Sequence, residues 1–376
     1  MRVAHVFKDY YPPTTGGIEQ HMHLLCGRLA ASMEVAVLVP SGGGSRSRVA
    51  ERVDGVTVVR VPEFGRYASV PLCPSMPREL RKLAPDIVHL HFPNPMGDIA
   101  YLLGNRGVPL VISYHADVVR QCALLPFYLP LIHQTFGHAG RILASSDEYA
   151  ASSVILSRYR PKCSVIPYGV DVHGLALRDG ERPQVEALKR HHPGGIVLFV
   201  GVLRPYKGIE ILLRAMTLVP QAHLLIAGAE PEPGRAAGLA TRLGLSSRVS
   251  LLGQVPEPRL RVLLHASDLL VLPSLDRREA FGIAQLEAMA CGKPVVSTDL
   301  PTGVRLVNRA GETGLLVAPG DPAALAEAIT RLLRDPDLRE RLGQAARERV
   351  IREFSVDRMV NQTIEIYSQL RPSLHD

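Results

Sequence analysis

Two glutamates stand eight positions apart in the second half of the chain, in the string Glu279-Ala-Phe-Gly-Ile-Ala-Gln-Leu-Glu287. The apolar residues 269–274 before them predict a buried parallel strand, and the segment after them predicts a helix. Glycine lets the backbone approach a ligand, and a helix N-terminus offers free N–H groups to a phosphate. We therefore expect Glu279 in the loop before the helix and Glu287 two turns down, where the carboxylates meet different parts of an extended ligand. Glutamates near helix starts also favour the dipole, so the pair alone leaves a structural role open.

A glycine-containing stretch, Thr14-Thr15-Gly16-Gly17-Ile18-Glu19, follows the first strand-like run and opens a helix-like segment. Backbone N–H groups at such a turn can bind a phosphate, and an ordinary turn is the alternative. No G-x-G-x-x-G or Walker sequence occurs in the chain. Because those sequences mark dinucleotide-dependent dehydrogenases and P-loop NTPases, both classes are disfavoured.

Several histidines stand at or near the ends of strand-like runs. His115 follows the run of residues 110–114, and Asp117 stands two positions later, where it could orient the ring or touch an acceptor. His89 and His91 end another run, and residues two apart on a strand face the same side. The ends of parallel strands face the ligand site, which favours function over a buried structural role. Two histidines without a third ligand give little support to a metal site.

Apolar strand-like runs alternate with helix-like stretches along the chain, which is the pattern of parallel sheets with right-handed crossovers. Periodicity fades over residues 171–193, where Arg, His, Gly and Pro cluster, and this predicts the break between two α/β halves. Ligands of such sheets bind beyond the carboxyl ends of the strands, so a cleft between the halves is the expected site. The predicted strands are residues 3–7, 35–39, 56–61, 87–91, 110–114, 141–144, 163–166, 196–200, 222–227, 249–252, 269–272, 294–297 and 315–317, and the predicted helices include 18–31, 76–83 and 356–370.

Composition is that of a globular protein with room for sizeable cores, at 376 residues, 46% hydrophobic and 21% charged. A formal net charge of +7 suggests an anionic partner such as a nucleotide, a lipid phosphate or a membrane surface. The absence of a nucleic-acid motif or Lys/Arg tract disfavours nucleic acid. We expect a cytosolic chain without a signal peptide, whose five scattered cysteines, Cys122 among them, are reduced thiols.

The string of residues 279–287 resembles the E-x7-E motif of the retaining glycosyltransferases of family GT4. The resemblance runs from Tyr10 to Tyr367, and residues 311–321 are its other specific element. It implies the α/β GT-B fold, in which two Rossmann-like, doubly wound parallel-sheet domains face one another across a cleft. Residues 1–172 would form the acceptor-binding domain and residues 173–355 the donor-binding domain, with a C-terminal helix at 356–376 packing back on the first.

The resemblance also implies roles for single residues. Residues 199–208 look like the family's strand and basic loop, in which an Arg and a Lys hold the donor diphosphate. Lys207 matches the family Lys, but the usual Arg falls at Val202. Arg204 lies two residues on and would restore the same face if the strand extended that far. Fixed cations at this place would stabilise the charge that grows on the leaving diphosphate.

Further roles follow from the same resemblance. Glu279 would hold sugar hydroxyls and support positive charge at the anomeric carbon, Glu287 would accept from the ribose, and His115 would lie close to the transferred sugar. Residues 167–171 resemble the segment before the interdomain linker, where Tyr168 replaces the Asn of many members. The implied donor-binding residues are Gly16, Gly17, Arg204, Lys207, Phe281, Gly282, Ile283 and Glu287, the implied catalytic residues are Glu279, His115 and Lys207, and the acceptor-side candidates are His91 and Asp117.

No metal or other cofactor is expected. The single D-x-D sequence, Asp335-Pro336-Asp337, lies in the charged tail and predicts a helix start. The divalent-metal site of GT-A transferases is therefore not supported, and the basic loop would neutralise the diphosphate.

The sequence thus favours a retaining glycosyltransferase that moves a hexosyl unit from a nucleotide diphospho-sugar to a hydroxyl group. Residues 88–95 and 114–121 look like bacterial mannosyl- and glucosyltransferases that build surface polysaccharides, which favours mannose from GDP-mannose and a glycan or lipid-linked acceptor. A UDP-sugar transferase acting on a small molecule, a nucleotide-sugar 2-epimerase and a non-catalytic sugar-nucleotide-binding protein stay open as alternatives.

Membrane association is a further expectation. Residues 46–82 contain eight basic and four acidic residues, and each basic residue near an anionic surface contributes about 1 kcal/mol. This count favours two interpretations equally. The segment either binds peripherally to the inner leaflet or is a basic face that is only solvated.

Overall fold

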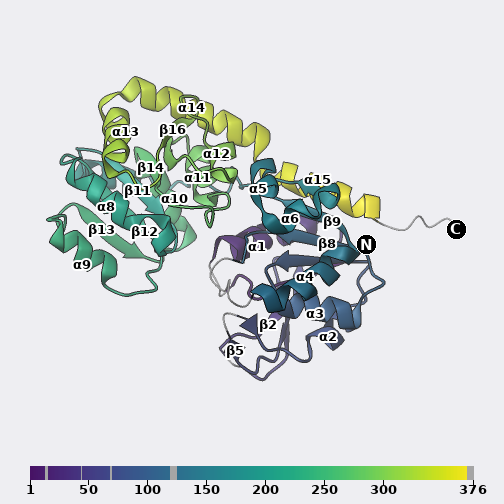
Figure 1. Cartoon of the computed structure of the whole chain (residues 1–376). Helices are drawn as coiled ribbons and strands as arrows, with labels where there is room; N and C mark the ends of the chain where they lie inside the picture. The colour runs from purple at the N-terminus through teal and green to yellow at the C-terminus, as the bar shows by residue number, and fades with distance from the viewer. Residues whose placement is uncertain (13–15, 44, 68–69, 119–124, 371–376) are drawn as a thin grey trace. The chain divides into compact units, whose positions relative to one another are not determined.

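A computed structural model describes residues 1–12, 16–43, 45–67, 70–118 and 125–370 (Figure 1). Thr14, Thr15, Gln121 and Cys122 lie outside the described residues, as does the segment 371–376 of the predicted last helix. The four described cysteines are free thiols.

The chain divides into two compact units, which we call unit 1 (Met1–Tyr168 with Val356–Asp376) and unit 2 (Gly169–Ser355). The break falls four residues before the predicted position after residue 172. The reason is local: the N–H of Val170 donates to the carbonyl of Phe354 at 2.9 Å, which ties this segment to unit 2.

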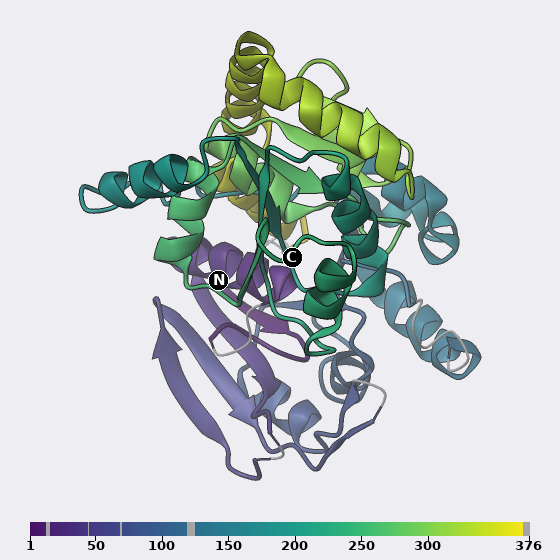
Figure 2. The same ribbon diagram turned by 90° about the vertical axis from the view of Figure 1, so that its left-hand side faces the viewer.

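Unit 1 is built on a sheet that has eight strands in the part of the chain described, in the order β10-β9-β8-β7-β1-β2-β4-β3. All neighbours are parallel except β3, which pairs antiparallel with β4 at the sheet edge, where the two arrows stand out in Figure 2. A two-stranded hairpin, β5–β6, follows. The strands are β1 (Arg2–Val6), β2 (Glu34–Pro40), β3 (Val49–Val53), β4 (Val56–Val61), β5 (Arg66–Tyr67), β6 (Val70–Pro71), β7 (Ile87–Phe92), β8 (Leu110–Tyr114), β9 (Ala139–Ala144) and β10 (Cys163–Val165).

Helices cover both faces of this sheet. α1 and α15 pack on one another over one face, and α2, α3 and α4 follow one another over the other, as right-handed crossovers on the two sides of β1 require. Met359, Ile366 and Tyr367 of α15 share one apolar core with Val3 and Met22. The helices are α1 (Gly17–Leu29), α2 (Met76–Lys82), α3 (Pro95–Gly104), α4 (Leu125–His138), α5 (Asp147–Ser152), α6 (Val154–Ser157), the 3₁₀ turn η2 (Arg160–Lys162) and α15 (Val356–Leu370).

Unit 2 has a parallel sheet whose described strands follow the order β13-β12-β11-β14-β15-β16. The central strands β11 and β14 are continuous apolar runs because helices bury both faces, and all four residues of β14 are buried. The strands are β11 (Ile196–Val200), β12 (His223–Ala227), β13 (Val249–Gly253), β14 (Leu269–Leu272), β15 (Val295–Thr298) and β16 (Gly314–Val317).

One helix of unit 2 begins at the D-x-D sequence of the charged tail. Asp335 caps α14 by accepting from the N–H of Leu338 at 2.9 Å, which confirms the helix start predicted there. One helix was not expected: residues 182–191 lie inside the predicted break but form α7. The helices are α7 (Arg182–His191), η3 (Pro205–Lys207), α8 (Ile209–Thr217), α9 (Arg235–Arg242), α10 (Glu257–Ala266), α11 (Ile283–Ala290), α12 (Gly303–Val307), α13 (Pro322–Arg334) and α14 (Pro336–Glu353).

Candidate active site

In unit 2 the strand order changes direction between β11 and β14. From β11 the chain runs outward to β12 and β13, and from β14 it runs the other way to β15 and β16. The carboxyl ends of the two strands at such a switch point are the usual ligand site of a doubly wound sheet. The loop with Lys207 follows β11 and the loop with Glu279 follows β14, so both predicted residues lie there.

The two loops are held together tightly. The N–H of Leu275 donates to the carbonyl of Tyr206 at 2.8 Å. Gly208 has a φ of 71°, and a Cβ at this position would lie 1.9 Å from the carbonyl oxygen of Pro273. Only glycine fits both the left-handed conformation and the close approach, so this residue fixes the basic loop against the end of β14.

Lys207 and Glu279 form a buried ion pair. Nζ of Lys207 contacts Oε2 of Glu279, and their side chains are 15% and 7% exposed. The hydroxyl of Ser274 donates to the same carboxylate oxygen at 2.9 Å. Burial alone would lower the pKa of Lys207, but the Glu279 carboxylate outweighs it and holds that pKa above its usual value. The cation and anion predicted to act on a donor thus meet in one place.

Arg204 does not take the predicted position on a strand. β11 ends at Val200, and Arg204 is an exposed residue that precedes η3. The strand does not extend far enough for residues 202 and 204 to share a strand face, because the chain has already left the sheet. A role for Arg204 rests on its charge in the loop beside Lys207.

The string between the two glutamates forms the start of α11. Gly282, with a φ of 76°, precedes Ile283 at the helix start, and no side chain caps the helix. A Cβ on Gly282 would lie 2.6 Å from Cδ2 of Leu272. Phe281, before this glycine, is buried. The placement of Glu279 before the helix and Glu287 within it is confirmed.

Glu287 lies in the second turn of α11. Burial, with a smaller contribution from the Glu257 carboxylate, raises the pKa of Glu287 to about 7. The group therefore changes charge close to neutral pH.

In unit 1 the predicted glycine loop ends at the start of α1, where Gly16 is the residue before the helix. A Cβ on Gly16 would lie 2.0 Å from Oε2 of Glu19, so a carboxylate already lies beside this helix start. A phosphate bound here would share the N-terminus with a negative charge.

His91 is not placed to contact an acceptor. Its ring is 0% exposed, with Nε2 lying 2.9 Å from Nδ1 of His5 and Nδ1 lying 2.8 Å from Nε2 of His115. The prediction that His91 is an acceptor-side residue is corrected for this reason. The end of β7 that carries His91 points into the core beneath α1 and α15.

His115 is 3% exposed and bridges His91 and Tyr168. Its Nε2 contacts His91, and its Nδ1 lies 2.6 Å from the hydroxyl of Tyr168. The carboxylate of Asp117 accepts instead from Tyr114 at 2.6 Å and from Ser153 at 2.8 Å. Tyr168 and His91, rather than Asp117, thus orient the ring of His115. Burial and neighbouring groups hold the pKa of His115 well below its usual value, so the ring is a neutral hydrogen-bonding group and not a base at neutral pH.

Sequence reasoning missed the third histidine of this cluster. Ring nitrogens of His5, His89 and His91 lie within 4.8 Å of one another, a set that could hold a metal ion. His5 comes from β1, and only the strand order, which places β1 beside β7, brings it to the other two. These rings already have hydrogen-bond partners in Tyr367, Ser113 and one another. Their geometry is that of a hydrogen-bonded cluster.

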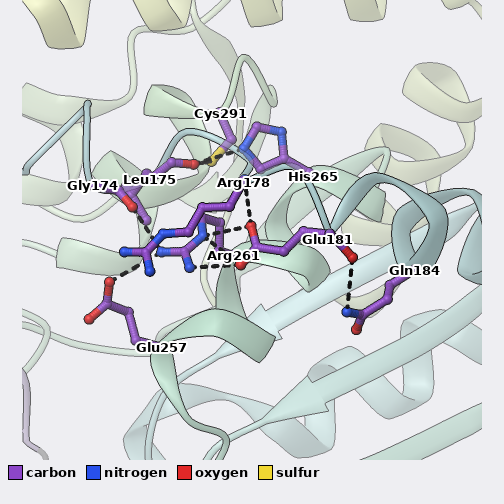
Figure 3. A network of polar contacts seen from close by, with 10 residues as sticks. Gly174, Leu175, Arg178, Glu181, Gln184, Glu257, Arg261, His265 and Cys291 are labelled. Atoms are coloured by element: carbon purple, nitrogen blue, oxygen red, sulfur yellow. Dashed lines mark hydrogen bonds and ion pairs between the residues drawn. The ribbon is translucent and has the colours of Figure 1, made fainter.

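A second buried network anchors the first residues of unit 2. The guanidinium of Arg261, 1% exposed, donates to both carboxylate oxygens of Glu181 at 2.7 to 3.1 Å and to the carbonyl of Gly174 at 2.9 Å (Figure 3). Arg261 also contacts Glu257, the carboxylate that acts on Glu287. Hydrogen bonding from Arg261 holds the pKa of Glu181 at about 2.

Arg261→Met is expected to lower the thermal unfolding midpoint of unit 2 by about 5 °C or more, because it leaves buried carboxylate and carbonyl groups without their donor. Scanning calorimetry measures the change. Arg242→Met, which removes an exposed arginine of the same unit, is the control and should stay near the wild-type midpoint. Equal midpoints for the two variants would show that the network does not anchor this segment.

Family models match both halves of the chain: Glycosyltransferase Family 4 over residues 15–173 and Glycosyl transferases group 1 over residues 182–349. The chain is 36% identical to the D-rhamnosyltransferase WbpZ of Pseudomonas aeruginosa, over 94% of this chain and 92% of that protein. It is 31% identical to the O-antigen chain mannosyltransferase C of Escherichia coli, over 99% and 100%.

Solved structures show the same fold at lower identity. A sucrose-phosphate synthase from Thermosynechococcus elongatus aligns with a TM-score of 0.81 at 24% identity, over 98% of each chain. WaaG, a glycosyltransferase involved in lipopolysaccharide biosynthesis, aligns with a TM-score of 0.71 at 18% identity, over 97% and 99%. Among the described helices, none is both long and apolar enough to cross a membrane.

Proposed function

The chain belongs to glycosyltransferase family 4 and has the GT-B fold, and from this premise we propose that it transfers a hexosyl unit from a nucleotide diphospho-sugar to a hydroxyl group with retention of configuration. The observation that carries the proposal is the buried pair of Lys207 and Glu279 at the switch point of unit 2. A fixed cation beside the start of α11 suits a leaving diphosphate, and a carboxylate suits the hydroxyls and the positive anomeric centre of the sugar.

We propose the following order of events for these groups. Lys207 holds the diphosphate and stabilises its growing charge as the glycosidic bond breaks, with Arg204 adding charge at the loop surface. Glu279 supports the anomeric centre, and Glu287 accepts from the ribose. The leaving phosphate oxygen takes the proton of the attacking hydroxyl, which is consistent with the lowered pKa of His115. The peptide groups of Gly16, Gly17 and residues 281–283 supply further donors to the phosphate or sugar.

The names of two relatives support a choice of donor and acceptor. Because the protein from Escherichia coli is named as an O-antigen chain mannosyltransferase and that from Pseudomonas aeruginosa as a D-rhamnosyltransferase, we favour a GDP-linked mannose-type donor and a growing surface polysaccharide or glycolipid as acceptor. The enzyme would work in the cytoplasm, without a metal or other cofactor.

The test is an assay of the purified protein against GDP-, UDP-, ADP- and dTDP-sugars. Thermal shift identifies the donor, since a ligand at about 100 times its Kd adds about 2.7 kcal/mol of stability. NMR of the anomeric proton in the product reports retention, and the same assay in EDTA reports metal dependence. A donor altered only at C2 would indicate a nucleotide-sugar 2-epimerase, and a shift without transfer or hydrolysis a binding protein. Loss of all activity in EDTA would contradict the metal-free mechanism.

Donor affinity is expected to rise about 10-fold between pH 6 and pH 8. The pKa of Glu287 is about 7, so the ionised fraction rises from about one in eleven to ten in eleven over this range. Ribose hydroxyls bind the carboxylate form, so donor binding releases a proton and strengthens as pH rises. Isothermal titration calorimetry at several pH values measures this dependence.

Two variants separate Glu287 from other titrating groups. Glu287→Gln should remove the pH dependence, and Glu257→Gln should shift it to lower pH because a neighbouring negative charge is lost. An unchanged pH dependence in Glu287→Gln would refute the assignment to this residue.

Weak, salt-sensitive binding to an anionic inner-leaflet surface is also expected, on the basis of the basic excess in residues 46–82. The structure reduces the positive charge that this segment can offer to a membrane surface. Four of its basic residues form ion pairs with acidic neighbours: Arg48, Arg60, Arg66 and Lys82. Sedimentation with anionic liposomes at low and high salt measures the effect. No binding at low salt would favour a soluble acceptor.

A further inference from the structure

A line of hydrogen-bonded side chains crosses the interior of unit 1. It starts at the hydroxyl of Tyr168, 2.6 Å from Nδ1 of His115, and continues from Nε2 of His115 to Nδ1 of His91 at 2.8 Å. Nε2 of His91 lies 2.9 Å from Nδ1 of His5, and Nε2 of His5 lies 3.3 Å from the hydroxyl of Tyr367. We call these five residues the histidine chain.

The line has a branch at its inner end. The hydroxyl of Tyr367 lies 2.5 Å from Nδ1 of His89, whose Nε2 lies 2.8 Å from the hydroxyl of Ser113. Ser113 is a buried residue of β8.

The sheet places these residues in a row. β1, β7 and β8 are neighbours, His5 is in register with His89, and His91 is in register with Ser113. Residues two apart on a strand face the same side, so the rings gather on the face that α1 and α15 cover. Tyr367 reaches them from α15, and Tyr168 closes the row at the end of the first of the two stretches that form unit 1.

Proton counting links the tautomers of the rings. The pKa values of His5, His91 and His115 are all held low by burial, so each ring is neutral and carries one N–H. Each contact between two ring nitrogens needs one hydrogen and has room for only one. If Nε2 of His5 carries the hydrogen, then Nε2 must carry it in His91 and His115 as well. If Nδ1 of His5 carries it, all three are Nδ1–H.

The distances select one of these two arrangements. The two shortest contacts join a tyrosine hydroxyl to a ring Nδ1, at 2.5 Å for His89 and 2.6 Å for His115, and phenol hydroxyls are strong donors. Both tyrosines therefore donate. Tyr168 then donates to His115, the three linked rings are Nε2–H, and Tyr367 accepts from His5 while donating to His89.

We propose that Tyr367 acts through the histidine chain as a positioning residue, fixing His115 as the Nε2–H tautomer and Tyr168 as a donor to that ring. In the reverse arrangement His115 would donate to Tyr168, whose hydroxyl would donate elsewhere. The direction of the chain thus decides which hydrogen-bonding character His115 and Tyr168 present. The catalytic consequence rests on the proposed function, whereas the tautomers do not.

A small cavity beside Tyr168 makes this direction matter. Its volume is about 20 Å³, room for a water molecule, and Tyr168, His115 and Ser113 help to line it. Nδ1 of His21 and the hydroxyl of Ser145, both buried in its wall, have no hydrogen-bond partner within the described structure. A polar guest in this cavity would meet an accepting Tyr168 in one arrangement and a donating Tyr168 in the other.

The direct test is long-range ¹H–¹⁵N NMR of protein labelled in histidine, at pH 7.5 with EDTA, which reports the tautomer of each ring. We expect His5, His89, His91 and His115 to be neutral and Nε2–H. Mixed tautomers among the three linked rings, or a charged ring, would overturn the proposal without any variant. Adding Zn²⁺ to a second sample without EDTA should leave these signals unchanged, and changes confined to His5, His89 and His91 would make the cluster a metal site instead.

Tyr367→Phe then tests action at a distance. The variant removes the acceptor of His5, and an orphaned buried N–H is costlier than an unused lone pair, so His5, His91 and His115 should all become Nδ1–H. His89 should stay Nε2–H through Ser113. Tyr101→Phe is the matched control, since this buried hydroxyl of unit 1 bonds to the carbonyls of Arg106 and Val108. A His115 that stays Nε2–H in Tyr367→Phe would refute the coupling.

Kinetics complete the test. Tyr367→Phe should lower kcat for glycosyl transfer about 10-fold or more with little change in the KM for the donor, whereas Tyr101→Phe should not. An unchanged kcat with a reversed His115 tautomer would overturn the positioning role. A wild-type protein without transfer activity, but with the expected tautomers, would instead refute the proposed function alone.

Discussion

Lys207→Ala is expected to lower the turnover of the sugar donor about 100-fold or more. The ammonium group lies at the switch point of unit 2, in contact with Glu279 and largely shielded from water. A preorganised charge in such a place stabilises the leaving diphosphate more strongly in the transition state than in the ground state. The loss should therefore appear in kcat, measured by release of the nucleoside diphosphate at saturating donor.

Three variants test whether the charge and its position are responsible. Lys189→Ala removes an exposed lysine of the same unit and should retain wild-type activity. Glu279→Gln keeps the size of the partner and should also lower kcat strongly. Arg204→Ala should match Lys207→Ala only if the exposed arginine takes over the role of the one missing at position 202. A folded Lys207→Ala protein with near wild-type kcat would exclude this residue from the chemistry.

Unit 1 is expected to lose about 5 kcal/mol of stability between pH 7.5 and pH 5.5, and to open before unit 2. Burial lowers the pKa of five histidines of unit 1, so they stay neutral in the fold but take up protons on unfolding below about pH 6.5. These stabilising contributions are present above that pH and are lost as pH falls. Asp98 opposes them, since burial raises its pKa to about 7 and protonation favours its folded form.

The magnitude follows from proton linkage. Each histidine costs about 1.4 kcal/mol at one pH unit below its unfolded pKa, and Asp98 returns about 2 kcal/mol, against a usual total stability of about 5 to 15 kcal/mol. Hydrogen exchange followed by mass spectrometry, corrected for the intrinsic effect of pH, resolves the two units. His89→Gln should reduce proton uptake on unfolding by about one, and exposed His138→Gln is the control. Equal protection of unit 1 at both pH values would contradict the prediction.

Much of the fold could be predicted because the relevant signals are local. β11, β14 and α15 have the predicted bounds, since their apolar runs or periodicity start and stop with the element. β3 was missed because its residues are exposed or partly exposed and include Glu51 and Arg52, so no apolar alternation marks this edge strand. α7 was missed because Val185 is its only buried residue, and the contact that anchors its start comes from Arg261, 80 positions away.

The residues of the candidate site divide in the same way, into those with a local sequence signal and those without one. Lys207, Glu279 and Glu287 were named as candidates because the basic loop and the string of residues 279–287 are specific, and the structure places the first two in contact. His91 was assigned to the acceptor side because a strand end predicts access to a ligand, but the helices that cover this end come from elsewhere in the chain. His5 and Tyr367 gave no signal, since their meeting depends on strand order and on a helix that returns after unit 2.

The return of the chain to unit 1 in α15 has a consequence for its synthesis on the ribosome. Unit 1 is made from two stretches separated by the whole of unit 2, and α15 is the last described element to be translated. While residues 169–355 emerge with all their own strands, the first unit still lacks the helix that packs on α1 and carries Tyr367. The half of the protein that is translated later is therefore the one able to finish folding first, and the nascent first half must wait, with apolar surface open to chaperones, until α15 has been translated.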